Sequence, residues 1–193
     1  MIVIKNLTKK YHGVTVLKNI SLKFEKGKVT YIVGANGSGK STLLKCIIES
    51  LNYDGKIERT LGEKFAYAPE KVQFPQYLSV KTFLNIISEN QQEIDSYLEK
   101  YNLSLDKKVK FSKLSKGMYQ KIVIIGVLLM NADAYIFDEP LSGFDDVAEK
   151  QFMKDIEKLV KNDKIVIIST HFQDKYQADL PHEIISLKKG LIV

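Results

Sequence analysis

The residues with the clearest chemical meaning form a glycine-rich segment, residues 34–41, which reads GANGSGKS. It satisfies the pattern G-x-x-x-x-G-K-[ST], in which the backbone N–H groups of a loop converge on phosphate oxygens. An apolar run precedes the segment and helical periodicity follows it, so the positive end of a helix dipole would face the phosphates. We expect Lys40 to contact the β- and γ-phosphates and Ser41 to help bind Mg²⁺. The expected phosphate contacts are Gly34, Asn36, Gly37, Ser38, Gly39, Lys40, Ser41 and Thr42.

Two adjacent carboxylates, Asp138 and Glu139, follow the apolar run at residues 134–137. A strand that ends this way delivers both groups to the C-terminal edge of a parallel sheet, where such sheets bind their ligands. There Asp138 would hold Mg²⁺ through its water shell, and Glu139 would act as a general base on the attacking water. The pair could also be the plain polar end of a strand before Pro140, but a complete phosphate loop earlier in the chain favours catalysis. We therefore expect a nucleoside triphosphatase.

Positioning these groups requires a sheet whose strands alternate with helices. Short apolar runs typical of strands buried on both faces lie at residues 29–33, 134–137 and 165–168. Helical periodicity lies between and after them, at residues 42–50, 80–88, 116–130 and 147–160. This alternation predicts an α/β fold with a mostly parallel central sheet. The first 30 residues, where alternation is strict at 20–25, predict an antiparallel β patch.

The stretch between the two halves of this sheet is mainly helix and loop. We expect a single domain of the P-loop NTPase type over residues 1–193. Its sheet core would comprise about residues 1–71 and 131–193, and an inserted helical subdomain would comprise about residues 72–130.

Composition fits a single globular domain and excludes several classes of protein. The chain has 193 residues, of which 45% are hydrophobic and 27% charged, and its one cysteine allows no intramolecular disulfide. The longest apolar stretch, residues 122–130, is far shorter than the ~20 residues that span a bilayer. The net charge of +6 comes mostly from scattered lysines, so no specific nucleic-acid partner is expected. We expect a cytoplasmic protein that reaches a membrane only through a partner.

A third motif, at residues 114–121, indicates the kind of triphosphatase. It reads LSKGMYQK and resembles the signature L-S-G-G-Q-x-Q-R of ATP-binding cassette (ABC) ATPases. The resemblance extends over essentially the whole chain, in the order and spacing of that family. It implies ATP and Mg²⁺ as cofactors, Glu139 as the catalytic base, and Ser115 and Gly117 as contacts to a γ-phosphate.

Further segments resemble the same family. The resemblance implies that Tyr11 stacks on adenine, that Glu70 occupies the place of a metal-binding glutamine, and that His171 is the switch histidine of hydrolysis. It also implies that Asp138 is the metal-holding aspartate and that residues 142–145, SGFD, form the D-loop.

Three positions depart from the family pattern. Glu70 replaces the usual glutamine, Lys116 replaces the first glycine of the signature, and Met118 replaces its first glutamine. A carboxylate at position 70 could still bind Mg²⁺ but adds negative charge near the triphosphate, so we expect altered metal affinity with function retained. Ser115 and Gly117, the expected γ-phosphate contacts, are both present.

The resemblance also implies partners. The signature of one subunit would cap the ATP held by a second copy or a homologous ATPase, in a head-to-tail dimer. A separately encoded transmembrane permease would dock near Glu70 and residues 72–111, which would hold the protein at the inner face of the cell membrane.

Transport is the expected task, and the brevity of the chain favours export over import. A soluble ABC ATPase that acts in cluster assembly or on nucleic acid or ribosomes is the alternative. A small P-loop kinase is a further one, but it would leave the matches at residues 114–121 and His171 to coincidence.

Overall fold

The computed structural model describes residues 1–60, 63–104, 106–171 and 180–193. Its strands are β1 (Ile2–Tyr11), β2 (Val14–Phe24), β3 (Val29–Val33), β4 (Asp54–Glu58), β5 (Phe65–Ala68), β6 (Ala134–Asp138), β7 (Ile165–Thr170), β8 (His182–Lys188) and β9 (Leu191–Ile192). Its helices are α1 (Lys40–Ile47), α2 (Val80–Ile87), α3 (Gln91–Lys100), α4 (Lys116–Leu129) and α5 (Asp146–Lys161), with a 3₁₀ turn at Phe111–Lys113. The apolar runs predicted as strands form strands, and the periodic segments form helices.

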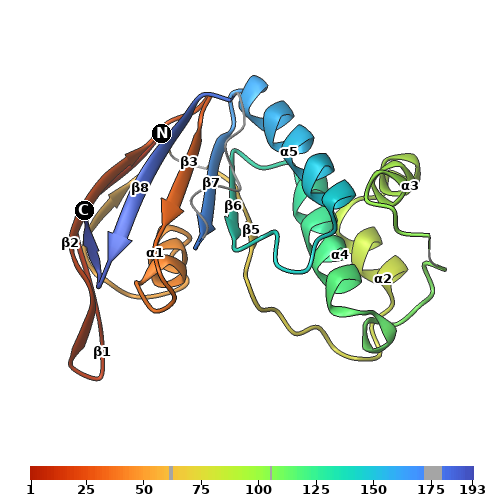
Figure 1. Ribbon diagram of the computed structural model, residues 1–193, viewed down its shortest axis with the longest axis horizontal. Coiled ribbons are helices and arrows are strands. Elements are labelled where there is room, and N and C mark those ends of the chain that lie inside the picture. Colours follow the sequence, from red (N-terminus) through yellow and green to blue (C-terminus); the bar gives the residue numbers. More distant parts are fainter. Residues whose placement is uncertain (61–62, 105, 172–179) are drawn as a thin grey trace.

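Two sheets hold the described strands (Figure 1). The larger has the strand order β5-β6-β7-β3-β8-β9 and is parallel except for β9, which pairs antiparallel with β8. The smaller has the order β2-β1-β4 and is antiparallel. The predicted α/β fold, with a mostly parallel sheet and an antiparallel patch, is thus confirmed. The patch also takes β4 from much later in the chain, which the prediction missed.

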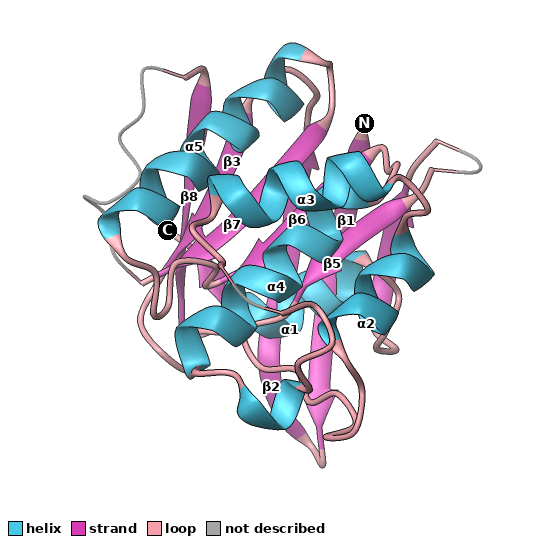
Figure 2. Cartoon of the chain, turned by 90° about the vertical axis from the view of Figure 1, so that its right-hand side faces the viewer, coloured by secondary structure: helices cyan, strands magenta, loops and turns pink. Residues whose placement is uncertain are grey.

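Helix α1 lies between the two sheets (Figure 1). Its buried Leu43 and Leu44 share one apolar core with Ile32 of β3 and Ile136 of β6. The neighbours of Ile32 along the strand belong instead to a second core on the opposite face, because side chains alternate in a strand. Helices cover that second face as well (Figure 2). Burial on both faces explains why the central strands are continuous apolar runs.

Helix α4 contains the longest apolar stretch of the chain and is buried from Gln120 to Leu129. It packs against α2, α3 and β5. Gly126 permits the close approach of α2, because a Cβ at this position would lie 2.8 Å from Cε1 of Phe83. The apolar stretch is therefore explained by protein packing. Within the described ranges, no helix combines the length and the apolar character that crossing a bilayer requires.

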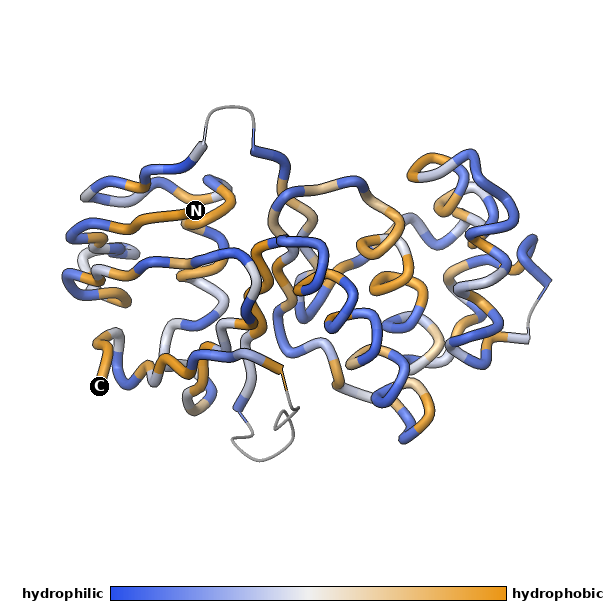
Figure 3. Tube along the Cα trace, turned by 90° about the horizontal axis from the view of Figure 1, so that it is seen from above, coloured by the Kyte–Doolittle hydropathy of each residue, from blue (hydrophilic) through white to orange (hydrophobic). Residues whose placement is uncertain are grey.

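Residues 72–130 contribute α2, α3 and α4, which lie to one side of the sheets, while both chain ends lie on the other side (Figures 1 and 3). The boundaries of a helical subdomain stay a prediction, since α4 packs on β5 as well as on α2 and α3. Helix α3 was not predicted. Of its ten residues only Ile94 and Leu98 are buried, so its apolar periodicity is weak.

Cys46 in α1 gives a first testable prediction. Its side chain is fully buried, and burial raises the pKa of the thiol to about 11. Because the thiolate is the reactive form, the folded protein should resist iodoacetamide at pH 8. Unfolding in urea should restore labelling, measured by mass spectrometry. Rapid labelling of the folded protein would contradict this prediction.

Candidate functional site

The phosphate loop joins the end of β3 to the start of α1, and two glycines allow its shape. Gly39 is the N-cap of α1 and has a left-handed backbone with a φ of 110°. A Cβ on Gly34 would lie only 2.3 Å from the carbonyl oxygen of Leu187 in β8. The loop therefore packs closely against the sheet and leads into a helix whose first N–H groups have no acceptor within the helix.

A cavity of about 390 Å³ opens at this loop. The predicted phosphate contacts Gly34 and Ser38 do not line it. The Gly34 carbonyl accepts a 2.7 Å hydrogen bond from Lys40, and the buried Ser38 Oγ has no hydrogen-bond partner among the described residues. The sequence reasoning missed two wall residues, Val16 and Lys71. The wall consists of Val16, Asn36, Gly37, Gly39, Lys40, Ser41, Thr42, Glu70, Lys71 and Glu139.

Lys40 and Glu139 line this cavity, and His171 contacts Glu139, although the three residues come from separate segments. The ammonium of Lys40, which is 6% exposed, lies 3.0 Å from Oε1 of Glu139. Nδ1 of His171 lies 2.5 Å from Oε2 of the same carboxylate. Glu139 has a φ of 52°, a left-handed conformation that costs a non-glycine residue about 1–2 kcal/mol. Such strain is typical of functional sites.

Asp138, the residue before Glu139, does not line the cavity and is 2% exposed. Its Oδ1 accepts a 2.5 Å hydrogen bond from the hydroxyl of Ser169, and its Oδ2 accepts a longer one, 3.4 Å, from the hydroxyl of Tyr67. Burial, and then the nearby charge of Asp138, raise the pKa of Tyr67 above its usual value, so this hydroxyl stays a donor. Sequence reasoning missed both donors.

The residues present fit a magnesium ion. Ser41 and Asp138 offer oxygen ligands, which Mg²⁺ prefers, and Ser41 lines the cavity. In the described part of the chain no cluster of three or more His, Cys, Asp or Glu side chains could hold a metal by itself. Phosphate and water oxygens would therefore complete the coordination, as is usual for Mg²⁺ in phosphoryl-transfer sites.

The predicted metal ligand Glu70 lies at the edge of the cavity, and the predicted adenine contact Tyr11 does not line it. Glu70 lines the cavity, but its side chain is 44% exposed and its nearest cation is Lys71, at 3.7 Å. Tyr11 ends β1, and the ammonium of Lys9 lies 4.8 Å from the centre of its ring. Val16, not Tyr11, is the wall residue from this part of the chain. The roles of Glu70 and Tyr11 stay predictions.

The signature segment does not line this cavity. Ser115 is the N-cap of α4, and its side chain accepts a 3.2 Å hydrogen bond from the N–H of Met118. Ser115 can therefore still donate its own hydroxyl proton. Gly117 packs against the predicted D-loop, since a Cβ there would lie 2.6 Å from the carbonyl oxygen of Gly143. Lys116, the departure from the signature, is exposed.

Lys121 in α4 connects this helix to the start of α5. Its buried ammonium lies 2.5 Å from Oδ2 of Asp145 and donates to the carbonyl of Tyr101 at 3.2 Å. This contact with Lys121 lowers the pKa of Asp145 below its usual value. Asp145 is also the N-cap of α5 and accepts a 2.9 Å hydrogen bond from the N–H of Ala148. One aspartate thus fixes the D-loop to the signature helix.

Replacing Asp145 by alanine should lower the free energy of unfolding by about 1–2 kcal/mol, because it removes a helix cap. It also leaves the buried Lys121 without its carboxylate. Asp146→Ala is the matched control: it removes the neighbouring exposed aspartate, which does not cap the helix. Urea denaturation measures the free energy of unfolding of both variants. Equal losses of stability in the two would contradict the role of Asp145.

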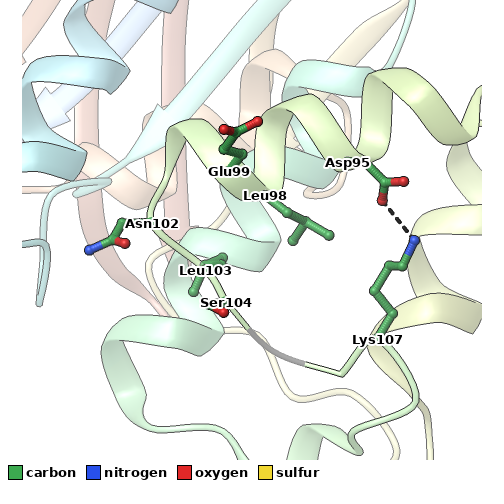
Figure 4. A pocket seen from close by; sticks show the side chains of 7 residues that line it. All are labelled: Asp95, Leu98, Glu99, Asn102, Leu103, Ser104 and Lys107. Atoms are coloured by element: carbon green, nitrogen blue, oxygen red, sulfur yellow. Dashed lines mark hydrogen bonds and ion pairs between the residues drawn. The ribbon is translucent and has the colours of Figure 1, made fainter.

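A second pocket, of about 340 Å³, lies beside the C-terminal half of α3 (Figure 4). Leu98 and Leu103 contribute to its lining, and an ion pair of 2.7 Å joins Asp95 to Lys107 within it. The residues predicted to bind nucleotide or metal lie elsewhere, so we assign this pocket no part in the chemistry.

A mostly parallel sheet that carries a complete phosphate-loop motif and two adjacent carboxylates at a strand end is typical of a P-loop nucleoside triphosphatase. Residues 17–142 match the ABC transporter family. The chain is 31% identical to the phosphonates import ATP-binding protein PhnC of Fusobacterium nucleatum, over 98% of this chain and 93% of that protein. It is also 31% identical to the zinc import ATP-binding protein ZnuC of Rickettsia bellii, over 84% of this chain and 72% of that protein. A solved dimeric bacterial ABC transporter cassette, 24% identical, superposes with a TM-score of 0.86 and is matched over 100% of this chain and 96% of its own.

The chain belongs to the ABC transporter family and is an ATP-binding ATPase. The expectation of export, however, is wrong. These two curated relatives, whose names state a direction, are import proteins. That expectation relied on the brevity of the chain, yet 98% of the chain aligns with 93% of the phosphonate import protein.

Proposed function

We propose that this chain is the ATP-hydrolysing subunit of an import-type membrane transporter and that it works with Mg²⁺. The proposal rests on the contacts of Glu139 at the phosphate-loop cavity. Its carboxylate, the proposed base, contacts both Lys40, the proposed phosphate ligand, and His171. The names of the import relatives support the direction. No observation favours the soluble alternative in cluster assembly or on nucleic acid.

Each residue of the site would have its own role in ATP hydrolysis. Lys40 would exchange its ion pair with Glu139 for contacts to the β- and γ-phosphates. Glu139 would accept a proton from water as the water oxygen bonds to the γ-phosphorus and the bond to the β-phosphate oxygen breaks, which releases ADP and phosphate. Bound Mg²⁺, held by Ser41 and Asp138, would supply positive charge to the phosphates. His171 would hold the carboxylate of Glu139 in place.

A second copy or a homologous ATPase would complete the site. Ser115 and Gly117 lie outside the cavity of their own chain, so they would meet the γ-phosphate of ATP bound to the other subunit. The similarity to a dimeric cassette supports this arrangement. Two such sites in one head-to-tail pair are related by a two-fold axis, which closes the assembly.

The membrane partner would be a separately encoded permease, and it would hold the protein at the inner, cytoplasmic face of the membrane. Tyr77, just before α2, and Ile86, within it, are 77% and 76% exposed, the highest values among the large apolar side chains of the described residues. We expect a cytoplasmic loop of the permease to bind at these exposed side chains of the helical segment.

Fractionation of cells that express the tagged chain tests this partner. The protein should sediment with membranes, and Tyr77→Asp should release it. Ile184→Asp, at a similarly apolar and 52% exposed position on β8, is the matched control and should not. Sedimentation with ribosomes, with release by nuclease, would instead support the soluble alternative and overturn the proposal.

A further inference from the structure

Ser169 lies in β7 and is completely buried. In the register of the parallel sheet it is the partner of Asp138 on β6. It thus lies directly beside the point where β6 ends and the chain turns into Glu139.

One hydroxyl group serves both acidic residues. Oγ of Ser169 lies 2.5 Å from Oδ1 of Asp138, and because an ionised carboxylate can only accept, the serine donates its single proton there. The lone pairs of the same oxygen remain available, and the N–H of Glu139 donates to it at 3.1 Å. The direction of both hydrogen bonds is therefore fixed by chemistry.

These bonds hold Glu139 in a backbone conformation that it would not otherwise prefer. Its φ is 52°, and its N–H contacts Ser169 twice, at Oγ and, at 3.2 Å, at the carbonyl oxygen. His171, two residues farther along the chain, contacts the Glu139 carboxylate. The end of β7 thus fixes the base at its backbone through Ser169 and at its side chain through His171.

We propose that Ser169 is a positioning residue that orients Asp138 and Glu139 together, so that the metal-holding carboxylate and the base reach their working positions at the same time. This inference rests on the roles proposed above for Asp138 and Glu139. Tyr67 also donates to Asp138, but at 3.4 Å its hydrogen bond is weaker and does not reach Glu139.

Ser169→Ala tests the inference. We expect kcat for ATP to fall about 10- to 100-fold, while KM for ATP changes less than about threefold, because the lost hydrogen bonds act on oriented charged groups and not on the phosphate loop. A second measurement does not depend on turnover. The Mg²⁺ concentration that half-saturates binding of a fluorescent ATP analogue should rise about 10-fold, while binding of the analogue in EDTA should stay unchanged.

Thr30→Val is the matched control. Thr30 lies in the adjacent strand β3, is 1% exposed, and has an Oγ1 without a hydrogen-bond partner in the described part of the chain. Its removal should change neither kcat nor the Mg²⁺ midpoint. Wild-type values in Ser169→Ala, or equal losses in Thr30→Val, would overturn the inference.

Two further variants keep the test decisive. Should Ser169→Ala fail to fold, Ser169→Cys takes its place, because its side chain has a similar shape but only a weak donor. The same fall in kcat and rise in the Mg²⁺ midpoint are expected of it. Glu139→Gln, measured in parallel, separates the two proposals. If it retains turnover, the proposed role of Glu139 fails; if it is inactive while Ser169→Ala is normal, only the role of Ser169 fails.

Discussion

Replacing Glu139 by glutamine is expected to lower the rate of ATP hydrolysis by about 10²- to 10⁴-fold, the usual contribution of a general base. The amide has nearly the shape of the carboxylate but cannot take up the proton of the attacking water. ATP binding should persist, because the phosphate loop and Lys40 are unchanged. Steady-state release of phosphate measures the turnover, and equilibrium binding of a fluorescent ATP analogue measures the affinity.

Glu70→Gln is the control for this experiment. It also replaces a carboxylate by an amide at the same cavity, but on an exposed side chain. The glutamine that it introduces is the residue of the family pattern. We expect turnover within a few fold of wild type, with a shift in the Mg²⁺ requirement. Unchanged turnover in Glu139→Gln would contradict its assignment as the base.

Replacing Lys40 by methionine is expected to abolish measurable turnover and to weaken ATP binding by about 10- to 100-fold. The ammonium is the charge that would face the β- and γ-phosphates, and hydrogen bonds to charged groups contribute about 1.5–3 kcal/mol each. The change also leaves Glu139, whose side chain is 12% exposed, without its 3.0 Å ion pair. Isothermal titration with ATP, together with thermal unfolding, separates lost binding from lost folding.

Lys71→Met provides the comparison. Lys71 lines the same cavity, but its side chain is 88% exposed and its ion pair with Glu70 is long, at 3.7 Å. Exposed pairs of this kind contribute little, so ATP affinity should stay within about threefold of wild type. If both lysine variants lost affinity equally, the effect would reflect the overall charge of the cavity, and the specific role of Lys40 would be wrong.

The elements that position the site were largely predictable because burial determines their sequence. Strands covered on both faces, such as residues 29–33, bury every side chain and are therefore mostly apolar. The prediction missed β4, whose residues 54–56 are exposed, and α3, where two buried side chains give little periodicity. Elements at the surface are thus the ones that sequence patterns specify least.

The candidate site was also only partly predictable from the sequence. The phosphate loop is one continuous segment, and residues 138–139 are another. The local sequence pattern of each segment alone indicates its chemistry. Ser169 and Tyr67 could not be assigned in advance, because they reach Asp138 only through strand register: β7 places Ser169 opposite it, and Tyr67 comes from β5 on the other side. A serine two residues before His171 was the available signal for Ser169.

The mass of Glu139→Gln in solution shows whether two copies of the chain enclose ATP in a head-to-tail dimer. Sedimentation velocity should report a monomer in EDTA and twice that mass at saturating MgATP, and adding Ser115→Arg to the same chain should return it to a monomer that still binds ATP. A variant that binds MgATP and nevertheless stays monomeric with Ser115 intact would contradict the head-to-tail dimer.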